Sequence, residues 1–339
     1  SARLHGTASS SVLLGWQGSS TSVVEAVLPT SWYTGRRGRP QSMPKLEACK
    51  ASNEAAALQG KIALCVGGSS GCGKGVALVL ARQGCSVTLV GRNAARGEEA
   101  VAACTAASPP DAGATFRFVS MDVRSLSAIA RFCDEFKAQA AQLDFLSLSC
   151  TRGGIQGYRP TAEGLDERVC TMYLSRFAFV HWLLPLLERA DDPRVLSILS
   201  AGHHKVYKAW QSDFLTRHAG MAQRTFAAGF YNDCACAALA RSQPKLTLIH
   251  AFPGFVRTNW HMELPWGLRA LTKVLMKAGK SLETCGEFMA YPLLCGTFDS
   301  GFHSLTEFAD PCASCAGDTA AEDGIWKLSV EQFEMRASA

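Results

Sequence analysis

A glycine-rich loop constrains the fold of this chain more than any other feature. The apolar segment Lys61–Val66 is a predicted strand, the loop Gly67–Gly75 follows it, and Gly73–Gln83 is a predicted helix that ends at Gly84. Glycines permit positive φ angles and let a backbone approach a ligand closely, and a helix N-terminus attracts anions. A strand, a loop of this kind and a helix in succession therefore predict a site for the pyrophosphate of a dinucleotide.

Further strands and helices alternate after the loop, which predicts an α/β fold. Single helices between strands imply a parallel sheet with right-handed crossovers and helices on both faces, a Rossmann-type doubly wound sheet in three α/β/α layers. The predicted strands after the first are Ser86–Val90, Thr115–Ser120, Phe145–Ser149, Val195–Leu199 and Leu246–Phe252. The predicted helices are Ala94–Ala106, Leu126–Ala140, Leu165–Glu188 and Ala222–Arg241.

The 339 residues suit one such domain with extensions. We assign residues 59–339 to the domain, with a lid segment at about 259–285 and an irregular C-terminal tail. Residues 1–58 form an N-terminal extension whose first 45 residues are rich in serine, basic and poor in acids. This composition suits the remnant of an organellar transit peptide, mitochondrial or plastid, and equally a disordered or clone-derived arm. A structural arm is also open.

Composition limits the partners and the compartment. A formal charge of +5 with dispersed basic residues predicts no nucleic-acid partner. Most of the 14 cysteines fall in or beside predicted strands and helices, which favours buried thiols in an intracellular reducing compartment, cytoplasmic if not organellar. The close pair Cys312 and Cys315 is weak evidence for a metal, and we assign no metal ligands; a loop disulfide or free thiols remain open. The longest apolar run, Phe177–Leu187, is too short for a predicted transmembrane segment.

The spacing of Gly67, Gly71 and Gly73 resembles that of the short-chain dehydrogenase/reductase family. The resemblance implies NAD(P) binding by Gly67, Ser69, Ser70, Gly71, Cys72, Gly73, Lys74, Arg92, Asn93, Asp122, Val123, Pro253, Gly254 and Thr258. Arg92 follows the second strand, where an acid would bind the ribose of NAD and an arginine suits a 2′-phosphate. NADP(H) is therefore expected in preference to NAD(H).

Within that family, the segment from Leu199 to His204 is similar to retinol-dehydrogenase-like and related fungal members, which makes Ser200 the serine that orients a substrate carbonyl. The family's proton transfer also requires a tyrosine and, four residues later, a lysine. No tyrosine in this chain has that spacing. An ungapped alignment places Thr225 at the tyrosine, Gly229 at the lysine and Met172 at the helix asparagine.

Three hypotheses follow from this mismatch. The first is an NADP(H)-binding pseudoenzyme. The second is an atypical oxidoreductase acting on a lipophilic carbonyl or alcohol beneath the apolar lid, with Tyr207, His203 or His204 as substitute proton donors. The third is a structural subunit of a larger assembly, reached by the N-terminal extension; a homo-oligomer is also open.

Overall fold

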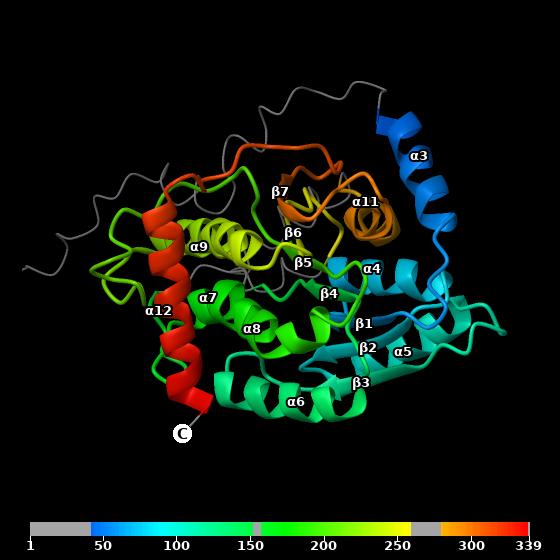
Figure 1. Cartoon of the computed structure of the whole chain (residues 1–339), viewed down its shortest axis with the longest axis horizontal. Helices are drawn as coiled ribbons and strands as arrows, with labels where there is room; N and C mark the ends of the chain where they lie inside the picture. Colours follow the sequence, from blue (N-terminus) through cyan, green and yellow to red (C-terminus); the bar gives the residue numbers. More distant parts are fainter. Residues whose placement is uncertain (1–41, 152–156, 259–278, 338–339) are drawn as a thin grey trace, which may run out of the picture. The chain divides into compact units, whose positions relative to one another are not determined.

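The computed structural model describes residues 42–151, 157–258 and 279–337. Within them the chain forms a seven-stranded parallel sheet in the order β3-β2-β1-β4-β5-β6-β7 (Figure 1). The strands are β1 Ile62–Val66, β2 Ser86–Gly91, β3 Phe116–Ser120, β4 Phe145–Leu148, β5 Arg194–Ile198, β6 Thr247–Ala251 and β7 Gly301–Leu305. The predicted α/β class and doubly wound sheet are confirmed.

The order of the strands reverses at β1, which pairs with β2 on one side and with β4 on the other. Val66, the last residue of β1, lies opposite Val90 in β2 and Leu148 in β4. The three strands therefore end together, and in open α/β sheets ligands bind at the carboxyl edge beside such a reversal. The glycine loop leaves the sheet at this edge.

Helices cover both faces of the sheet, and each layer has its own apolar core. One core joins the sheet to α4 (Gly71–Arg82), α5 (Ala94–Ala107) and α11 (Leu282–Leu294). The other joins it to α6 (Leu126–Gln139), α8 (Ser175–Leu187), α9 (Met221–Ser242) and α12 (Thr319–Ala337). Each helix packs on the sheet through apolar residues that recur on one of its faces. In α4, for example, Val76, Ala77, Val79, Leu80 and Ala81 are buried.

The predicted helix Leu165–Glu188 is a composite. It comprises α7 (Glu167–Val169), a π-helical turn η1 (Cys170–Leu174) and α8. Within the described residues, Glu167–Leu187 is the one helix long and apolar enough to cross a membrane, and 78% of its most apolar window is buried inside the fold. Here this segment is a core helix, and π-helical turns of this kind often mark functional positions.

The prediction of an irregular C-terminal tail is wrong, because this region is regularly folded. It contains α11, the edge strand β7 and the 19-residue helix α12. Helix α12 buries Ala321, Ile325, Ser329 and Phe333, a four-residue repeat on one helix face. A polar serine within a narrow apolar stripe gives little periodic signal in the sequence, and tertiary packing decides the helix.

The predicted N-terminal extension contains one described helix, α3 (Ser42–Glu54), which packs against α11. Asn53 fixes it by donating from Nδ2 to the Glu287 carboxylate at 2.8 Å and to the Glu287 carbonyl at 3.0 Å. Residues 1–41 and most of the predicted lid, 259–278, lie outside the described residues. The transit peptide, the assembly arm and the lid therefore remain predictions.

Candidate dinucleotide and reaction site

Two backbone features shape the glycine loop. Gly67 has a φ of +86°, in the left-handed region that favours glycine, and its N–H donates to the Val90 carbonyl at 2.8 Å. A Cβ on Gly73 would lie 2.2 Å from Ser149 Oγ and 2.6 Å from the Gly67 carbonyl oxygen. Only glycine fits there, because the first turn of α4 lies against the ends of β1 and β4. The loop thus presents backbone N–H groups and a helix N-terminus to the carboxyl edge of the sheet.

A groove of about 870 Å³ lies over this edge. Twelve of the fourteen predicted cofactor residues line it: Gly67, Ser69, Ser70, Gly71, Cys72, Lys74, Arg92, Asn93, Asp122, Val123, Pro253 and Thr258. Gly73 lies buried beneath the loop. Gly254 packs against Glu307, and a Cβ added to Gly254 would lie 2.8 Å from the Glu307 Cβ. The groove has the size and the backbone donors that a dinucleotide requires, so the residues present fit such a cofactor.

Charges in the groove are unevenly neutralised. Arg124 binds the Asp122 carboxylate through Nε at 3.0 Å and Nη2 at 2.6 Å, and through Nη1 it also binds Glu167 at 2.5 Å. In the described part of the chain, Arg92 and Lys74 form no ion pair. Their charge is available to an anion. Sequence reasoning missed Arg96 and Arg257, which also line the groove; single arginines without a motif gave no signal.

Arg176, on α8, lies buried against the carboxyl ends of β4 and β5 and was also missed. Its guanidinium is fully buried and donates to the carbonyls of Leu148 at 2.7 Å and Ile198 at 3.0 Å, and to Ser197 Oγ at 2.9 Å. Burial lowers the pKa of Arg176 to about 10. The side chain ties together the ends of β4 and β5, where Cys150 and Ile198 line the groove. A buried arginine bonded to carbonyls is positioned to stabilise the sheet edge.

The reaction end begins at Ser200, immediately after β5. Its Oγ is buried and has no hydrogen-bond partner within the described residues. Helix α9 passes beside it and carries the two substituted positions: Thr225 Oγ1 donates back to the Met221 carbonyl at 3.1 Å, and Gly229 faces the ring of His204. Met172 lies in the π-helical turn, and its carbonyl accepts from Asn232 Nδ2 at 3.0 Å. Met172 and Gly229 carry no titratable group, and the Thr225 hydroxyl is bonded within its own helix.

The described tyrosines are engaged elsewhere. Tyr207 donates to Asp213 at 3.0 Å, and burial together with this bond raises its pKa to about 12. Tyr231 donates to the Phe214 carbonyl at 3.2 Å inside the aromatic core, and Tyr173 bonds Ser329 at 2.6 Å. Tyr158 lies at the surface, where its hydroxyl bonds the Gly164 carbonyl. The bond to Asp213 argues against Tyr207 as a substitute for the tyrosine at 225.

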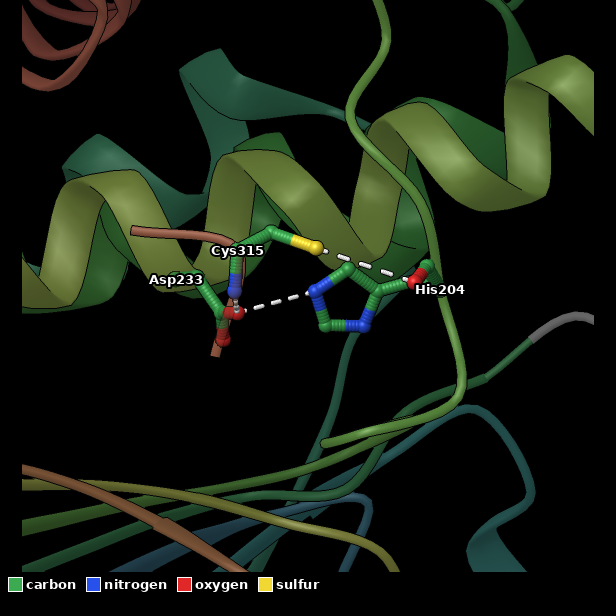
Figure 2. A group of neighbouring side chains, drawn as sticks. All are labelled: His204, Asp233 and Cys315. Atoms are coloured by element: carbon green, nitrogen blue, oxygen red, sulfur yellow. Dashed lines mark hydrogen bonds and ion pairs between the residues drawn. The ribbon is translucent and has the colours of Figure 1, made fainter. Parts of the chain in front are cut away.

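A buried network of His204, Asp233 and His250 lies beneath Ser200. Asp233, on α9, accepts from His204 Nε2 at 2.9 Å (Figure 2). It also accepts from His250 Nδ1 at 2.6 Å. The same carboxylate accepts from Ser314 Oγ at 2.8 Å and from the Cys315 N–H at 2.7 Å. All three side chains of the network are at most 1% exposed. The network thus connects α9, β6 and the loop after β7.

The hydrogen-bond partners determine the protons on both histidines. Ser200 N–H donates to His250 Nε2 at 3.2 Å, so that nitrogen is bare and His250 is neutral, with its proton on Nδ1. His204 lies between two acceptors, the Ser200 carbonyl at 2.9 Å from Nδ1 and Asp233 at Nε2. Both nitrogens must donate, so His204 is an imidazolium paired with the Asp233 carboxylate.

The pKa directions agree with this assignment. Hydrogen bonding and charge from Asp233 outweigh burial and raise the pKa of His204 above its ordinary value, whereas burial lowers that of His250. The two histidines lower the pKa of Asp233 despite its burial. The two histidines thus fix the backbone of Ser200: His250 accepts from its N–H, and His204 donates to its carbonyl. Sequence analysis missed Asp233 and His250; an acid in the middle of a buried helix and a histidine inside a buried strand were the available signals.

Cys315 completes a group of three potential metal ligands with His204 and Asp233, whose ligand atoms all lie within 4.8 Å of one another (Figure 2). The Cys315 thiol points to the His204 carbonyl at 3.7 Å. Because His204 has no unprotonated nitrogen and Asp233 already accepts four hydrogen bonds, the geometry matches a hydrogen-bonded network.

Comparisons with known proteins agree with the fold. A family profile described as short chain dehydrogenase matches residues 61–223. The oxidoreductase AN1596 of Emericella nidulans is 32% identical over 223 residues, which cover 64% of this chain and 65% of that protein. The chain therefore spans slightly less than two thirds of that relative.

Other relatives share the family rather than one stated activity. The short-chain dehydrogenase/reductase SAT2 of Stachybotrys chartarum is 30% identical over 282 residues, covering 74% of this chain and 77% of that protein. Human polyprenol dehydrogenase is 26% identical over 225 residues, covering 63% and 66%. A variant of a Serratia marcescens short-chain dehydrogenase/reductase superposes with a TM-score of 0.55 at 22% identity, over 75% of this chain and all (100%) of that one. The chain belongs to the short-chain dehydrogenase/reductase family.

Proposed function

We propose that this chain binds NADP(H) and has lost the proton transfer of its family, so that it acts as a dinucleotide-binding pseudoenzyme. One observation carries the proposal: Thr225 and Gly229 stand where the tyrosine and lysine are expected, and the space beside Gly229 is filled by the His204 ring. Loss of a positioned general acid typically lowers rates by about 10²–10⁴-fold.

The preference for NADP(H) rests on charge. Arg92 follows β2 and lines the groove together with Lys74 and Arg96. A guanidinium can bind a 2′-phosphate through two parallel hydrogen bonds, which NAD(H) cannot offer. Among the described residues that line the groove, two are acids: Asp122 is held by Arg124, and Glu99 lies on α5. The three cations Arg92, Lys74 and Arg96 outnumber Glu99 at this end of the groove.

Fluorescence titration tests the cofactor proposal. NADPH should bind more tightly than NADH, and Arg92→Ala should remove most of that difference, a loss of about 10- to 100-fold for a charged hydrogen bond worth about 1.5–3 kcal/mol. Arg131→Ala, an exposed arginine on α6, is the matched control and should change neither affinity. Unchanged NADPH affinity in Arg92→Ala would refute the assignment of the 2′-phosphate.

Turnover tests the pseudoenzyme proposal. NADPH oxidation with a panel of aldehydes and ketones should remain at the rate without substrate. Sustained turnover that Ser200→Ala abolishes would refute it. The panel should include long-chain prenyl aldehydes, because one relative is named polyprenol dehydrogenase.

Sustained turnover would favour the second candidate, an atypical oxidoreductase for a lipophilic carbonyl or alcohol. The supporting observation is Ser200, whose Oγ has no partner within the described residues and is free to bond a carbonyl oxygen. The proton would then come from His203, which is half-buried with its ring 4.1 Å from that of Phe252. Burial lowers the pKa of His203, so it would hold a proton less readily than an ordinary histidine.

A further inference from the structure

One pair of thiols lies at the groove itself. Cys72 is the second residue of α4 and lines the groove, whereas Cys285 on α11 is fully buried behind it. The two thiols lie close enough for each to influence the pKa of the other. One member of the pair is therefore open to solutes in the groove, and the other is reached only through the first.

A close helix crossing holds the two cysteines together. A Cβ on Gly75 would lie 2.7 Å from the Leu282 carbonyl oxygen and 3.1 Å from the Gly286 Cα. The backbones of α4 and α11 thus touch at Gly75 and Gly286. Cys72 lies one turn before the first glycine and Cys285 directly precedes the second, so both cysteines lie at the crossing.

The surroundings of Cys72 favour its thiolate. It lies in the first turn of a 12-residue helix, where the unpaired N–H groups and the helix dipole attract negative charge. The half-buried Lys280 supplies a nearby cation. Its Nζ donates to the Glu307 carbonyl at 2.6 Å and lies 5.3 Å and 4.9 Å from the ring centroids of Phe288 and Phe308.

Cys72 differs in this respect from the other cysteines. The interaction with Cys285, and then the charge of Lys280, lower the pKa of Cys72 against the effect of burial. Burial is the main cause that raises the pKa of eleven other cysteines, and for Cys285 the interaction with Cys72 is the largest cause of a raised pKa. Cys150 makes the contrast local: it lines the same groove, yet burial raises its pKa to about 11.

We propose that Cys72 and Cys285 form an oxidisable thiol pair in the dinucleotide groove, with a hydroperoxide as its reactant. The Cys72 thiolate attacks the peroxide, an S–O bond forms, the O–O bond breaks, and water or an alcohol leaves after protonation. The Cys285 sulfur then attacks the Cys72 sulfenic acid: an S–S bond forms, the S–O bond breaks, and the Cys285 proton leaves with the hydroxide as water. Two thiols are oxidised to a disulfide and one peroxide is reduced.

The pair is coupled to dinucleotide binding, and this step rests on the proposed function. Cys72 belongs to the loop that would hold the pyrophosphate, so a bound dinucleotide covers its thiol. A disulfide ties the loop to α11 and fixes it in one geometry. Because linkage is reciprocal, if the disulfide weakens dinucleotide binding, a bound dinucleotide disfavours the disulfide at equilibrium by the same factor.

Peptide mass spectrometry of the full chain tests the pair without any dinucleotide. Limiting hydrogen peroxide should produce a Cys72–Cys285 disulfide with the loss of two hydrogens. In Cys285→Ser, dimedone should trap a sulfenic acid at Cys72, and Cys72→Ser should abolish both products. Cys104→Ser, which removes a buried thiol of the same helix layer, is the matched control and should leave the disulfide intact.

Alkylation rates test whether Cys72 is a thiolate. Iodoacetamide should alkylate Cys72 at least about tenfold faster than Cys150. Equal rates, or no disulfide in the wild type, would overturn the proposal.

A second arm adds NADP⁺ at saturation. Slower oxidation of Cys72, with NADP⁺ bound less tightly by the oxidised chain, supports the coupling. Unchanged oxidation in a chain that demonstrably binds NADP⁺ overturns the coupling. A chain that forms the disulfide but does not bind NADP⁺ overturns the proposed function and leaves the thiol pair standing.

Discussion

The two ends of the groove differ in how they are built. The dinucleotide end depends on backbone: the φ of Gly67, the space at Gly73 and the N-terminus of α4. In the family's pattern the reaction end depends on side chains of α9, and this chain has Thr225 and Gly229 at the aligned positions. Backbone geometry is fixed by the fold, whereas a side chain can differ without disturbing the sheet. On the proposed function, binding and turnover in this architecture are therefore expected to be separable.

The replacement at the reaction end is not a simple loss. The His204 imidazolium with the Asp233 carboxylate forms a buried ion pair at the place where a lysine is expected. Each remaining polar group of the pair is hydrogen-bonded, which a buried charge requires. The rebuilt end is thus expected to contribute to stability, and the glycine end to binding.

Asp233→Asn should have the largest effect on this comparison. Removing one partner of a buried ion pair costs about 3–5 kcal/mol, because the other charge is left uncompensated. Urea unfolding at neutral pH should show a decrease of that order in the free energy of unfolding, while NADPH affinity of the folded variant stays within about threefold.

Asp134→Asn provides the control. Asp134 pairs with Lys137 on the surface of α6 at 2.9 Å, with 75% of its side chain exposed. Surface pairs of this kind contribute about 0–1 kcal/mol. If the two variants lost equal stability, the buried network would not be the stabilising element described here.

Gly73→Ala should have the next largest effect, which is on dinucleotide binding. The added Cβ meets Ser149 Oγ and the Gly67 carbonyl, and such overpacking costs about 1–3 kcal/mol. If the loop shifts to relieve it, the Kd for NADPH should rise by roughly 10- to 100-fold in fluorescence titration. Gly296→Ala, where nothing lies within 4 Å of the new Cβ, should leave the Kd unchanged. Wild-type affinity in Gly73→Ala would show that the loop does not set the binding geometry.

The pH dependence of stability should show a smaller effect. The folded pKa of His204 is raised, so its contribution is complete below the unfolded value of 6.5 and is lost as pH rises through the folded pKa. The folded pKa of His250 is lowered, so its contribution is present above 6.5 and is lost as pH falls. Each limb has a slope of at most about 1.4 kcal/mol per pH unit.

Urea unfolding between about pH 5 and 9 measures both limbs, because this range extends to either side of the ordinary histidine pKa. His204→Gln should flatten the alkaline limb and keep the acid one. An alkaline limb that survives this substitution would contradict the assignment of the imidazolium.

Ser200→Ala should have the smallest effect. Its Oγ has no partner within the described residues, so removing it breaks no hydrogen bond and should change stability by about 0.5 kcal/mol or less. NADPH affinity should also be unchanged in titration. A tenfold weaker affinity would mean that the two ends are not separable.

The sequence predicted the part of the molecule that repeats a regular pattern. Lys61–Val66 and Gly67–Gly75 specify a strand and a loop by local residue types, and β1 and α4 form where expected. Helix α12 was missed because its apolar stripe is interrupted by Ser329, which bonds Tyr173 across the core. That stabilising contact joins residues 156 positions apart, and no local window contains it.

The site was predictable to the same degree. Most predicted cofactor residues line one groove because they all follow the carboxyl ends of strands. The His204, Asp233 and His250 network was not predictable, because its members come from a loop, a helix and a strand that meet only in the folded chain. The substitutions at Thr225 and Gly229 were visible, but the ring that fills the space beside Gly229 was not.

That ring has a consequence for any attempt to install the missing pair by design. A side chain at position 229 would place its Cβ 2.6 Å from the His204 ring, so a lysine does not fit while the histidine remains. Removing the histidine first leaves Asp233 without its counterion. No single substitution therefore installs the lysine without disturbing the core, and a tyrosine at position 225 would be needed as well.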